Sequence, residues 1–480
     1  MVSGNQTLFA ESELDQLHDA VLCVMSNTGL KICDDRFLNG VASIGARVDW
    51  DARVARFPPS LVEAFIDRRK TTESARASHR DTQAGPYEAS LSSVIAPFVH
   101  DYPTKTRRWS TRADLVEITR WAEIDTPQSR SVGLAVTMSD VDPHVEPIEA
   151  YALLLEMTSR PSPAYATDSD QVKYLIDIAA VYYGEPRFPR GIDFMTSPLT
   201  FGDRLARFTR EAIEFGETHF GIGVMPICGG NAPMTIAGNV VVSAAELLGA
   251  WLTIQSLQPE ATFSGSACNG MTDMRRGVAT FNAPEALLAD LGVCELFERR
   301  YGGRVGVAAG ADYIDARLPG MQAAYERTMR AMAIAAFTGG PYAMGGAGTL
   351  DEGKVFSAVQ FILEREMGAG LWRLGQGIEV TPETLAVDTI AEVGVGEGKS
   401  YLTSDHTLRH YRETWFPEYL VRGMWESDAV EFAREAQMME RAYQHYRDCV
   451  ARYAAPQIDE SKLRQIRRIV ARAREDLLRR

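Results

Sequence analysis

The chain has 480 residues, of which 45% are hydrophobic and 24% are charged, and its formal net charge is −14. This composition is ordinary for a soluble globular protein, and the acidic balance disfavours nucleic acid as a partner because phosphate binding needs a basic surface. No charge-free apolar run approaches the roughly 18 residues that cross a bilayer, so we expect no membrane span.

The N-terminus has no basic start followed by an apolar core, so the sequence predicts a cytoplasmic protein without a secretory signal. None of its cysteines forms a CxxC pair, which predicts reduced thiols rather than disulfides or a cysteine-based zinc site. The six cysteines are Cys23, Cys33, Cys228, Cys268, Cys294 and Cys449.

The first 70 residues have helical patterns. Leu14, Leu17 and Val21 share one face of a segment that starts after a serine cap and ends at Gly29, and a second helix starts at the prolines of RFPPSLVEAFI. Residues 71–86 are polar and read as a loop. We therefore expect residues 1–90 to form a helical N-terminal cap.

From residue 91 onward, strand-like and helical segments alternate, which is typical of a parallel sheet. The expected strands are 131–138, 164–167, 192–196, 223–228, 262–265, 304–309 and 342–345. The expected helices are 145–158, 170–182, 203–219, 239–257, 284–300 and 318–336. Seven or eight units without a dominant nucleotide motif favour a TIM (β/α)8 barrel over an open sheet. The eighth strand would be 377–380 or the stretch before the first of these strands.

We expect the barrel to cover residues 91–420 and a helical extension to cover 421–480. The last stretch, SKLRQIRRIVARAREDLLRR, is a basic amphipathic helix. In so acidic a protein a solvated or oligomer-contacting arm is favoured over a nucleic-acid tail. We expect a homo-oligomer.

Ligand groups of a barrel lie on the loops after its strands. These loops are 138–140, 196–197, 228–231, 264–269, 311–315 and 345–349. The stretch 225–277 shows the pattern best: strand, glycine-rich turn, apolar helix, strand. The backbone N–H groups of its glycine-rich turn could approach a ligand closely, although a close-packed turn without a ligand is the favoured interpretation of the glycines. The residues alone predict a barrel enzyme with a site near 229–231 and Asp312, without naming a reaction.

Two local patterns suggest other chemistry. AEVGVGEGKSYL at 391–402 is similar to an S-adenosylmethionine loop, but fewer than 90 residues follow and they look helical, whereas a Rossmann unit needs more strands. His406 and His410 share a helical face and could bind a metal with Glu413. Local hydrogen bonding within a capped helix is the favoured interpretation, and we predict no tightly bound metal.

Five stretches of this chain match, in the same order, stretches of a known protein family. They are RFPPSLVEAFI, SPLTF, GGNAPMTIAGNVVVSAAELLGAWLTIQ with DMRRG, DARLPGMQAAYER, and LAVDTIAEVGVGEGKSYLTSDHTLRHYRETWFPEYLVR. Together they resemble the trimethylamine methyltransferase family, a corrinoid-dependent group that also contains glycine betaine methyltransferases. The resemblance covers nearly the whole chain.

The resemblance implies a TIM barrel that transfers a methyl group from an amine to the cobalt of a corrinoid (methylcobalamin) carried by a separate small protein at the barrel mouth. The founding methylamine enzymes contain pyrrolysine, whereas this chain has only the twenty standard residues. In this respect it is similar to the betaine-demethylating branch of the family. We therefore expect methyl transfer from a betaine-like quaternary amine to Co(I). The alternatives are a quaternary-amine binding protein without corrinoid chemistry, or a trimethylamine-like substrate.

A quaternary amine leaves as a neutral tertiary amine, so the protein mainly has to orient the cation and we assign no nucleophile. Aromatic faces with a nearby carboxylate suit such a cation. The expected cation-binding residues are Tyr102, Tyr313, Tyr342 and Asp312. The residues expected to bind a substrate carboxylate or to line the mouth are Thr196, Asn231, Ser266 and His406. The glycines expected to face the cofactor are Gly229, Gly230 and Gly346.

Overall fold

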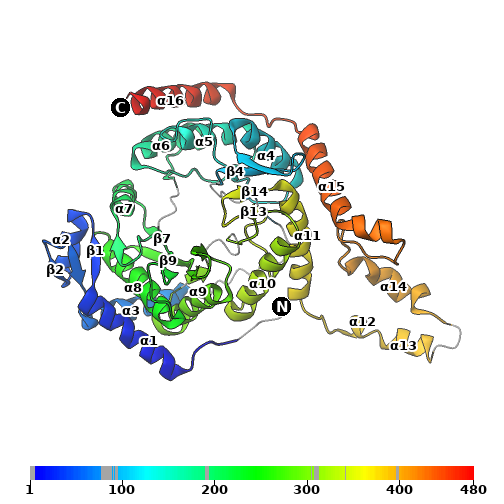
Figure 1. Cartoon of the computed structure of the whole chain (residues 1–480), viewed down its shortest axis with the longest axis horizontal. Helices are drawn as coiled ribbons and strands as arrows, with labels where there is room; N and C mark the ends of the chain where they lie inside the picture. Colours follow the sequence, from blue (N-terminus) through cyan, green and yellow to red (C-terminus); the bar gives the residue numbers. More distant parts are fainter. Residues whose placement is uncertain are drawn as a thin grey trace.

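The computed structural model describes residues 6–76, 89, 91, 96–189, 194–303, 305–307, 313–340, 342–395 and 399–479. Figure 1 shows helices α4 to α11 arranged as a ring around several small sheets, with further segments attached to the outside of the ring. The fold is therefore mixed α/β, as the alternation of segments predicts.

The N-terminal region contains a small sheet as well as helices. Its elements are α1 (Glu11–Cys23), the π-helical turn η1 (Val24–Thr28), β1 (Leu30–Ile32), α2 (Asp35–Ser43), β2 (Arg47–Asp49), β3 (Val54–Arg56) and α3 (Pro59–Arg76). The strand order is β2-β3-β1-β6, where β6 (Thr200–Phe201) is parallel to β1 and so joins this region to the ring. The expected helices are present, and the three short strands were not predicted because three-residue strands are too short to show a period of two. Helix α1 also starts after Ala10 rather than after a serine.

One arc of parallel strands is formed by β7 (His219–Val224), β9 (Thr262–Ala267) and β12 (Val305–Val307). Phe194 extends this arc through a parallel bridge to Gly223. The helices of this half are α7 (Asp203–Phe215), α8 (Ile236–Gln255), α9 (Pro284–Leu296) with the π-turn η3 (Phe297–Tyr301), and α10 (Met321–Thr338). Strands β7 and β9 confirm the strands expected at 223–228 and 262–265, although β7 starts and ends earlier and β9 ends two residues later than expected.

A second arc is made of short parallel contacts. Leu91 and Ala96 bridge Val132 and Val136, and Val132 bridges Pro161. On the other side, β4 (Phe98–Asp101) is parallel to β14 (Val355–Phe356). The helices of this half are α4 (Arg112–Asp125), α5 (Glu146–Met157), α6 (Val172–Tyr183) after the 3-10 turn η2 (Ser169–Gln171), and α11 (Ala358–Gly375). No closed circle of strands joins the two arcs within the described residues.

Several strand predictions change. The segments 164–167 and 342–345 contain no strand, and 377–380 is not the eighth strand, because Ile378 and Val380 are exposed rather than packed beside a neighbouring strand. The expected strands 192–196 and 304–309 lie partly outside the described residues. Hairpins add β5 (Thr106–Trp109), β10 (Gly270–Asp273), β11 (Val278–Thr280) and β13 (Thr349–Leu350). The short strand β8 (Ile227–Cys228), at the end of the expected strand 223–228, is parallel to β10.

Helix α8 is the central core helix. The helix is long and apolar enough to cross a membrane, although the sequence analysis expected no such segment. However, 72% of its most apolar 18-residue stretch is buried inside the protein. Contacts with α1, α2 and α9 and with strand β7 cover it on all sides, which explains why its residues are apolar all round. Gly249 lets Leu30 approach closely, since a Cβ there would lie 2.3 Å from a Leu30 methyl group.

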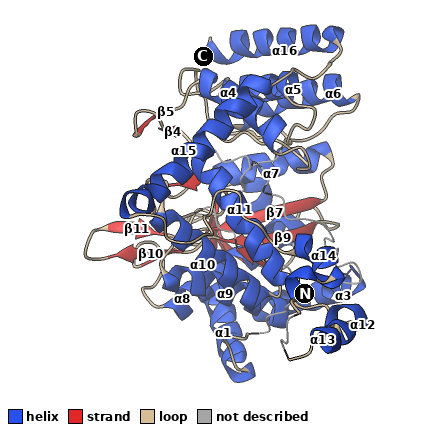
Figure 2. Ribbon diagram, turned by 90° about the vertical axis from the view of Figure 1, so that its right-hand side faces the viewer, coloured by secondary structure: helices blue, strands red, loops and turns tan. Residues whose placement is uncertain are grey.

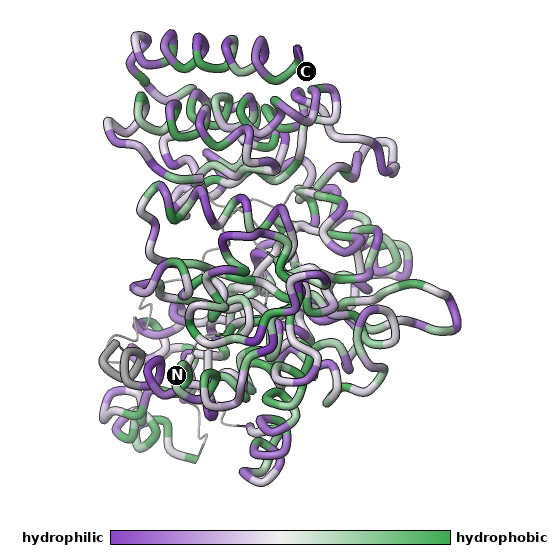
Figure 3. Tube along the Cα trace, turned by 90° about the vertical axis from the view of Figure 1, so that its left-hand side faces the viewer, coloured by the Kyte–Doolittle hydropathy of each residue, from purple (hydrophilic) through white to green (hydrophobic). Residues whose placement is uncertain are grey.

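Two long helices end the chain, α15 (Asp428–Arg452) and α16 (Glu460–Leu478). Figures 1 and 2 show α16 lying along α5 and α6, and Figure 3 shows apolar and polar residues alternating along it. Its buried face (Ile466, Ala473, Leu477) joins the core of α5 and α6. Its arginines pair with acidic residues of the same helices, for example Arg467 with Glu156 at 2.6 Å. The basic terminal helix therefore packs on its own chain rather than extending into solvent.

Candidate functional site

The sheet of β7 and β9 has one apolar face and one polar face. Phe220, Ile222 and Phe263 pack with Trp251 of α8 in the core. On the opposite face, which Figure 1 shows toward the centre of the ring, the His219 ring nitrogens contact Thr262 Oγ1 at 3.0 Å and Ser264 Oγ at 3.1 Å. The inside of this arc is thus lined by hydroxyl groups, glycine and one imidazole.

Aromatic and apolar side chains gather beyond the carboxyl ends of this arc. The group, called here the mouth cluster, contains Phe194, Met225, Ile227, Cys268, Phe281 and Tyr313. The rings of Phe281 and Tyr313 are 5.3 Å apart between centroids and are tilted by 41°. Gly223 makes room for Phe194, because a Cβ there would lie 2.5 Å from its ring. The loops after β7, β9 and β12 therefore build one aromatic surface.

A carboxylate lies next to the mouth cluster. Asp315 Oδ2 accepts a hydrogen bond from Thr280 Oγ1 at 2.5 Å, while Asp315 Oδ1 is buried without a hydrogen-bond partner among the described residues. Burial is the main cause that raises the pKa of Asp315 above its ordinary value. A cation bound beside Asp315 would therefore be stabilised by this carboxylate, and the cation would in turn favour the ionised form of the side chain.

A cavity of about 850 Å³ opens beside Asp315. It lies between the β10–β11 hairpin, the segment 315–322 and the turn 351–354. Its wall carries four carboxylates and three cationic groups: Asp273, Asp315, Asp351, Glu352, Arg276, Arg317 and Lys354. Exposed apolar side chains stand on the same rim: Met274 at the hairpin tip, with Val278, Leu318 and Met321.

A buried polar network fixes the loop after β9. Asp290 of α9 accepts hydrogen bonds from Asn269 N at 2.6 Å and Asn269 Nδ2 at 3.0 Å, and Ser243 of α8 donates to Asn269 Oδ1 at 2.8 Å. Arg330 approaches Asp290 at 3.7 Å and donates to the Phe281 carbonyl at 2.7 Å. Burial raises the pKa of Asp290 to about 7. This network holds both Cys268 and Phe281 of the mouth cluster in place.

The structure brings some of the predicted site residues together. Tyr313 belongs to the mouth cluster, and Ser266 lies on β9, with its side chain partly exposed. Asn231 is used locally: its Oδ1 accepts from Ile227 N at 2.6 Å and its Nδ2 donates to the Ser197 carbonyl at 3.5 Å, next to exposed Thr196. Gly229 has a positive φ of 76° in the same turn, and Gly230 follows it. Gly229 and Gly230 are exposed, and the hydrogen bonds of Asn231 hold the turn together.

Other predicted residues lie apart from the mouth cluster. Tyr342 packs against Leu371 and Gly375 near the C-terminal end of α11, whereas the ligand face of a β/α unit is at the start of its helix. Gly346 accepts a turn hydrogen bond from Thr349 N at 3.1 Å. His406 lies on a helix outside the ring, beside the His410 ring. Asp312 lies outside the described residues.

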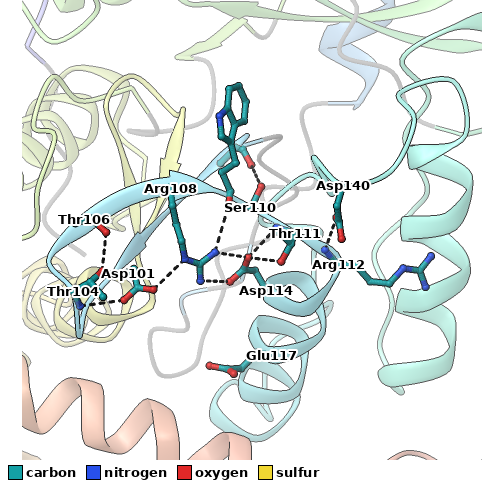
Figure 4. A network of polar contacts seen from close by, with 12 residues as sticks. Asp101, Thr104, Thr106, Arg108, Ser110, Thr111, Arg112, Asp114, Glu117 and Asp140 are labelled. Atoms are coloured by element: carbon teal, nitrogen blue, oxygen red, sulfur yellow. Dashed lines mark hydrogen bonds and ion pairs between the residues drawn. The ribbon is translucent and has the colours of Figure 1, made fainter.

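Tyr102 belongs to a different pocket, between β4 and α15. Its ring centroid lies 4.9 Å from that of Tyr443, and the Lys105 ammonium group lies over the Tyr102 ring. Figure 4 shows how Arg108 holds this hairpin, with bonds to Asp101 and to both oxygens of Asp114, the latter at 2.7 Å. The tyrosine thus already has a cation and an aromatic partner of its own chain.

Three potential metal ligands also meet near α15. Atoms of Asp125, His445 and Cys449 lie within 4.8 Å of one another. Arg365 pairs with Asp125 at 2.6 Å, and Arg452 donates to Cys449 Sγ at 3.1 Å. The hydrogen bond to Asp125 raises the pKa of His445 to about 10, which favours the protonated imidazole, and a metal would have to displace that proton. The cluster is better explained as a set of ion pairs that attach α15 to the body of the chain.

His410, which was considered as a metal ligand with His406 and Glu413, makes local contacts instead. Its ring nitrogens contact Glu413 at 2.9 Å and Glu383 at 3.3 Å.

Comparison with known proteins identifies the family of this chain. The family model described as trimethylamine methyltransferase matches residues 3–477. The chain belongs to the trimethylamine methyltransferase family. A trimethylamine methyltransferase of Desulfitobacterium hafniense is 27% identical over 98% of this chain and 94% of its own length. A second one, from Methanosarcina mazei, is 25% identical over 97% and 95%. A glycine betaine methyltransferase of Desulfitobacterium hafniense is 24% identical over 94% of both chains.

Phe194, Phe281 and Asp315 are candidate site residues that the sequence interpretation did not single out. Asp315 is the last residue of the loop 311–315, one of the loops after strands on which ligand groups were expected. Phe281 follows a hairpin inserted after β9, so no strand or helix period marks it. Phe194 was inside an expected strand, and only its bridge to Gly223 shows that it reaches the mouth cluster.

Proposed function

We propose that this protein is a methyltransferase that takes a methyl group from a quaternary amine, such as a betaine, and transfers it to the Co(I) of a corrinoid carried by a separate protein. Family membership over nearly the whole chain and relatives named for trimethylamine and glycine betaine support the reaction class. We also propose that the two parallel arcs belong to one (β/α)8 barrel spanning 91–420, between an N-terminal cap and a C-terminal extension, which is supported by the ring of helices.

The observation that carries the proposal is the mouth cluster beside Asp315. A quaternary ammonium group has no N–H to donate, so aromatic faces and a carboxylate are the groups that bind it. Phe281 and Tyr313 supply the faces and Asp315 supplies the negative charge. Because the leaving group is a neutral amine, holding and orienting the cation is the main task of these residues.

The rim of the mouth fits a protein that presents a corrinoid. Exposed Met274, Val278, Leu318 and Met321 surround the cavity together with cationic Arg276, Arg317 and Lys354. Exposed apolar side chains rimmed by charges are typical of protein interaction sites. When bound there, the corrinoid supplies the cobalt nucleophile that accepts the methyl group, while this chain positions the methyl carbon and keeps water from the apolar cluster.

The test is a mixture of the protein with a Co(I) corrinoid and one amine from a panel of glycine betaine, proline betaine, carnitine, choline and trimethylamine. The proposal expects the cobalt absorption spectrum to change with at least one quaternary amine and only when the protein is present. An unchanged spectrum with the whole panel would refute it. If calorimetry then detected amine binding, the protein would be a quaternary-amine binding protein, the rival function.

Replacing Tyr313 by Leu should raise KM for the active quaternary amine by about 2- to 30-fold, because a cation–π contact contributes about 0.5 to 2 kcal/mol. The measurement is the initial rate of methyl transfer at varied amine concentration. Tyr183→Leu on the outer helix α6 is the control, since that ring contacts Arg187 and lies outside the mouth cluster. Equal effects of the two substitutions would remove Tyr313 from the cation site.

A further inference from the structure

A segment outside the ring has an unusual surface. Residues 376–426, called here the arm, connect α11 to α15 and contain α12 (Pro382–Leu385), α13 (Val387–Val393), η4 (Tyr401–Thr403), α14 (Asp405–His410) and η5 (Tyr411–Glu413). Figure 1 shows α12, α13 and α14 projecting away from the ring at the lower right of the view. The arm is a large segment with little contact with the body of its own chain.

The arm exposes its large apolar side chains. Ile378, Val395, Leu402 and Met424 are 92%, 93%, 85% and 89% exposed. The other exposed large apolar residues of the arm are Val380, Leu385, Val387, Ile390, Tyr401, Leu408, Tyr411, Phe416, Val421 and Trp425. Only Val393 and Tyr419 are buried among the described residues of the arm. Exposed apolar side chains in this number on one segment are typical of an interaction site.

Polar contacts, rather than an apolar core, hold the arm in shape. Glu383 of α12 accepts from Arg409 of α14 at 3.0 Å and contacts His410 of α14 at 3.3 Å. Glu366 of α11 attaches the end of the arm by accepting the backbone N–H groups of Tyr419 and Leu420 at 2.8 and 2.7 Å. Exposed ion pairs stabilise a fold only slightly. The arm is therefore an element held by polar contacts whose large apolar side chains are left uncovered by its own chain.

The position of the arm separates it from the mouth. It leaves the body at the C-terminal end of α11, whereas the mouth cluster lies beyond the carboxyl ends of the strands, where the helices begin. The arm also has eight carboxylates against four Lys and Arg among its described residues, which disfavours an anionic membrane surface. Neither the corrinoid-carrying protein nor a lipid surface suits it.

A matching surface exists on the body of the same chain. Tyr325 and Met332 are exposed on α10, and Leu374 is exposed at the end of the neighbouring α11, directly before the arm begins. A stable interface typically uses about 20 to 30 residues on each side, so 51 arm residues with fourteen exposed large apolar side chains exceed that need. When both surfaces belong to one chain, two copies can satisfy each other reciprocally around a two-fold axis.

We propose that the arm, residues 376–426, is an oligomerisation element that packs its apolar side on a second copy of this chain, on the α10–α11 surface at the base of that copy's own arm. The proposal does not depend on the methyl-transfer reaction.

Sedimentation velocity of the full chain over about 0.1 to 50 μM tests it. We expect a particle of at least twice the 53.0 kDa chain mass. The double variant Leu402→Asp with Met424→Asp should raise the dissociation constant by about 100-fold or more, because two charges would be buried in an apolar interface, while the circular dichroism spectrum stays the same. Trp50→Asp, a substitution of an exposed aromatic residue in the N-terminal region, should leave the mass unchanged.

A wild-type particle of 53.0 kDa throughout this range would overturn the proposal, as would a folded double variant with unchanged association. If the double variant fails to fold, cross-linking of wild-type chains mixed from normal and heavy-isotope preparations decides. Mixed-isotope cross-links between the arm and α10 or α11 support the proposal. Cross-links from the arm that occur only within one chain refute it.

Discussion

Replacing Arg327 by Met is expected to lower the free energy of unfolding by about 3 to 5 kcal/mol, because it leaves a buried carboxylate without its counter-charge. Arg327 of α10 and Glu364 of α11 are both fully buried, with Arg327 Nε 3.2 Å from Glu364 Oε1. Arg327 also donates to the carbonyl and hydroxyl oxygens of Thr349, and Glu364 Oε2 accepts from Gly348 N at 2.7 Å. The pair therefore joins two helices to the glycine-rich segment between them.

Urea unfolding followed by circular dichroism measures this effect. Arg317→Met is the matched control, since Arg317 is 81% exposed and its contact with Asp351 is long, at 3.7 Å, so we expect a change of less than about 0.5 kcal/mol. Combining Arg327→Met with Glu364→Gln should recover part of the loss, because the second substitution removes the unpaired charge. A loss of less than about 1 kcal/mol for Arg327→Met would show that the carboxylate finds another partner or becomes neutral at little cost.

Replacing Glu246 by Gln should stabilise the protein above pH 7 by up to about 3 kcal/mol and reduce the fall of stability with rising pH. Glu246 of α8 is fully buried and accepts hydrogen bonds from Leu199 N and Ser197 Oγ, both at 2.8 Å. Burial raises its pKa from 4.5 to about 7. Since the folded state holds this proton more tightly than the unfolded state, Glu246 costs nothing below about pH 4.5 and becomes increasingly destabilising as the pH rises through 7.

The measurement is urea unfolding at pH 5 and pH 8 for both proteins. Asp290, whose pKa is also raised to about 7, affects both proteins alike, so the difference between them isolates Glu246. Glu214→Gln is the control, because that side chain is 58% exposed in its pair with Arg36. Parallel pH profiles for wild type and Glu246→Gln would mean that Glu246 ionises in the folded state without penalty.

Both buried carboxylates hold backbone segments at strand ends. Glu246 holds 197–199, which contacts the Asn231 turn through the Ser197 carbonyl, and Glu364 holds Gly348. Asn231 illustrates a limit of prediction from sequence. A polar residue after a glycine-rich strand end is a reasonable ligand contact, but here its amide oxygen and nitrogen both serve the backbone, and that use is visible only when Ile227 and Ser197 are placed around it.

The amino-acid sequence by itself determined the alternation of strands and helices, the long apolar helix α8 and the family, because these follow from periodicity and local composition along the chain. The tertiary structure decided which aromatic residues share a site. Tyr102, Tyr313 and Tyr342 were all expected at the cation site, yet only Tyr313 meets Phe281, 32 positions away. It also decided that α16 packs inward and that the arm stays outside. These arrangements depend on contacts between segments far apart in the sequence, and the local hydrophobic periodicity of the chain carries no information about such contacts.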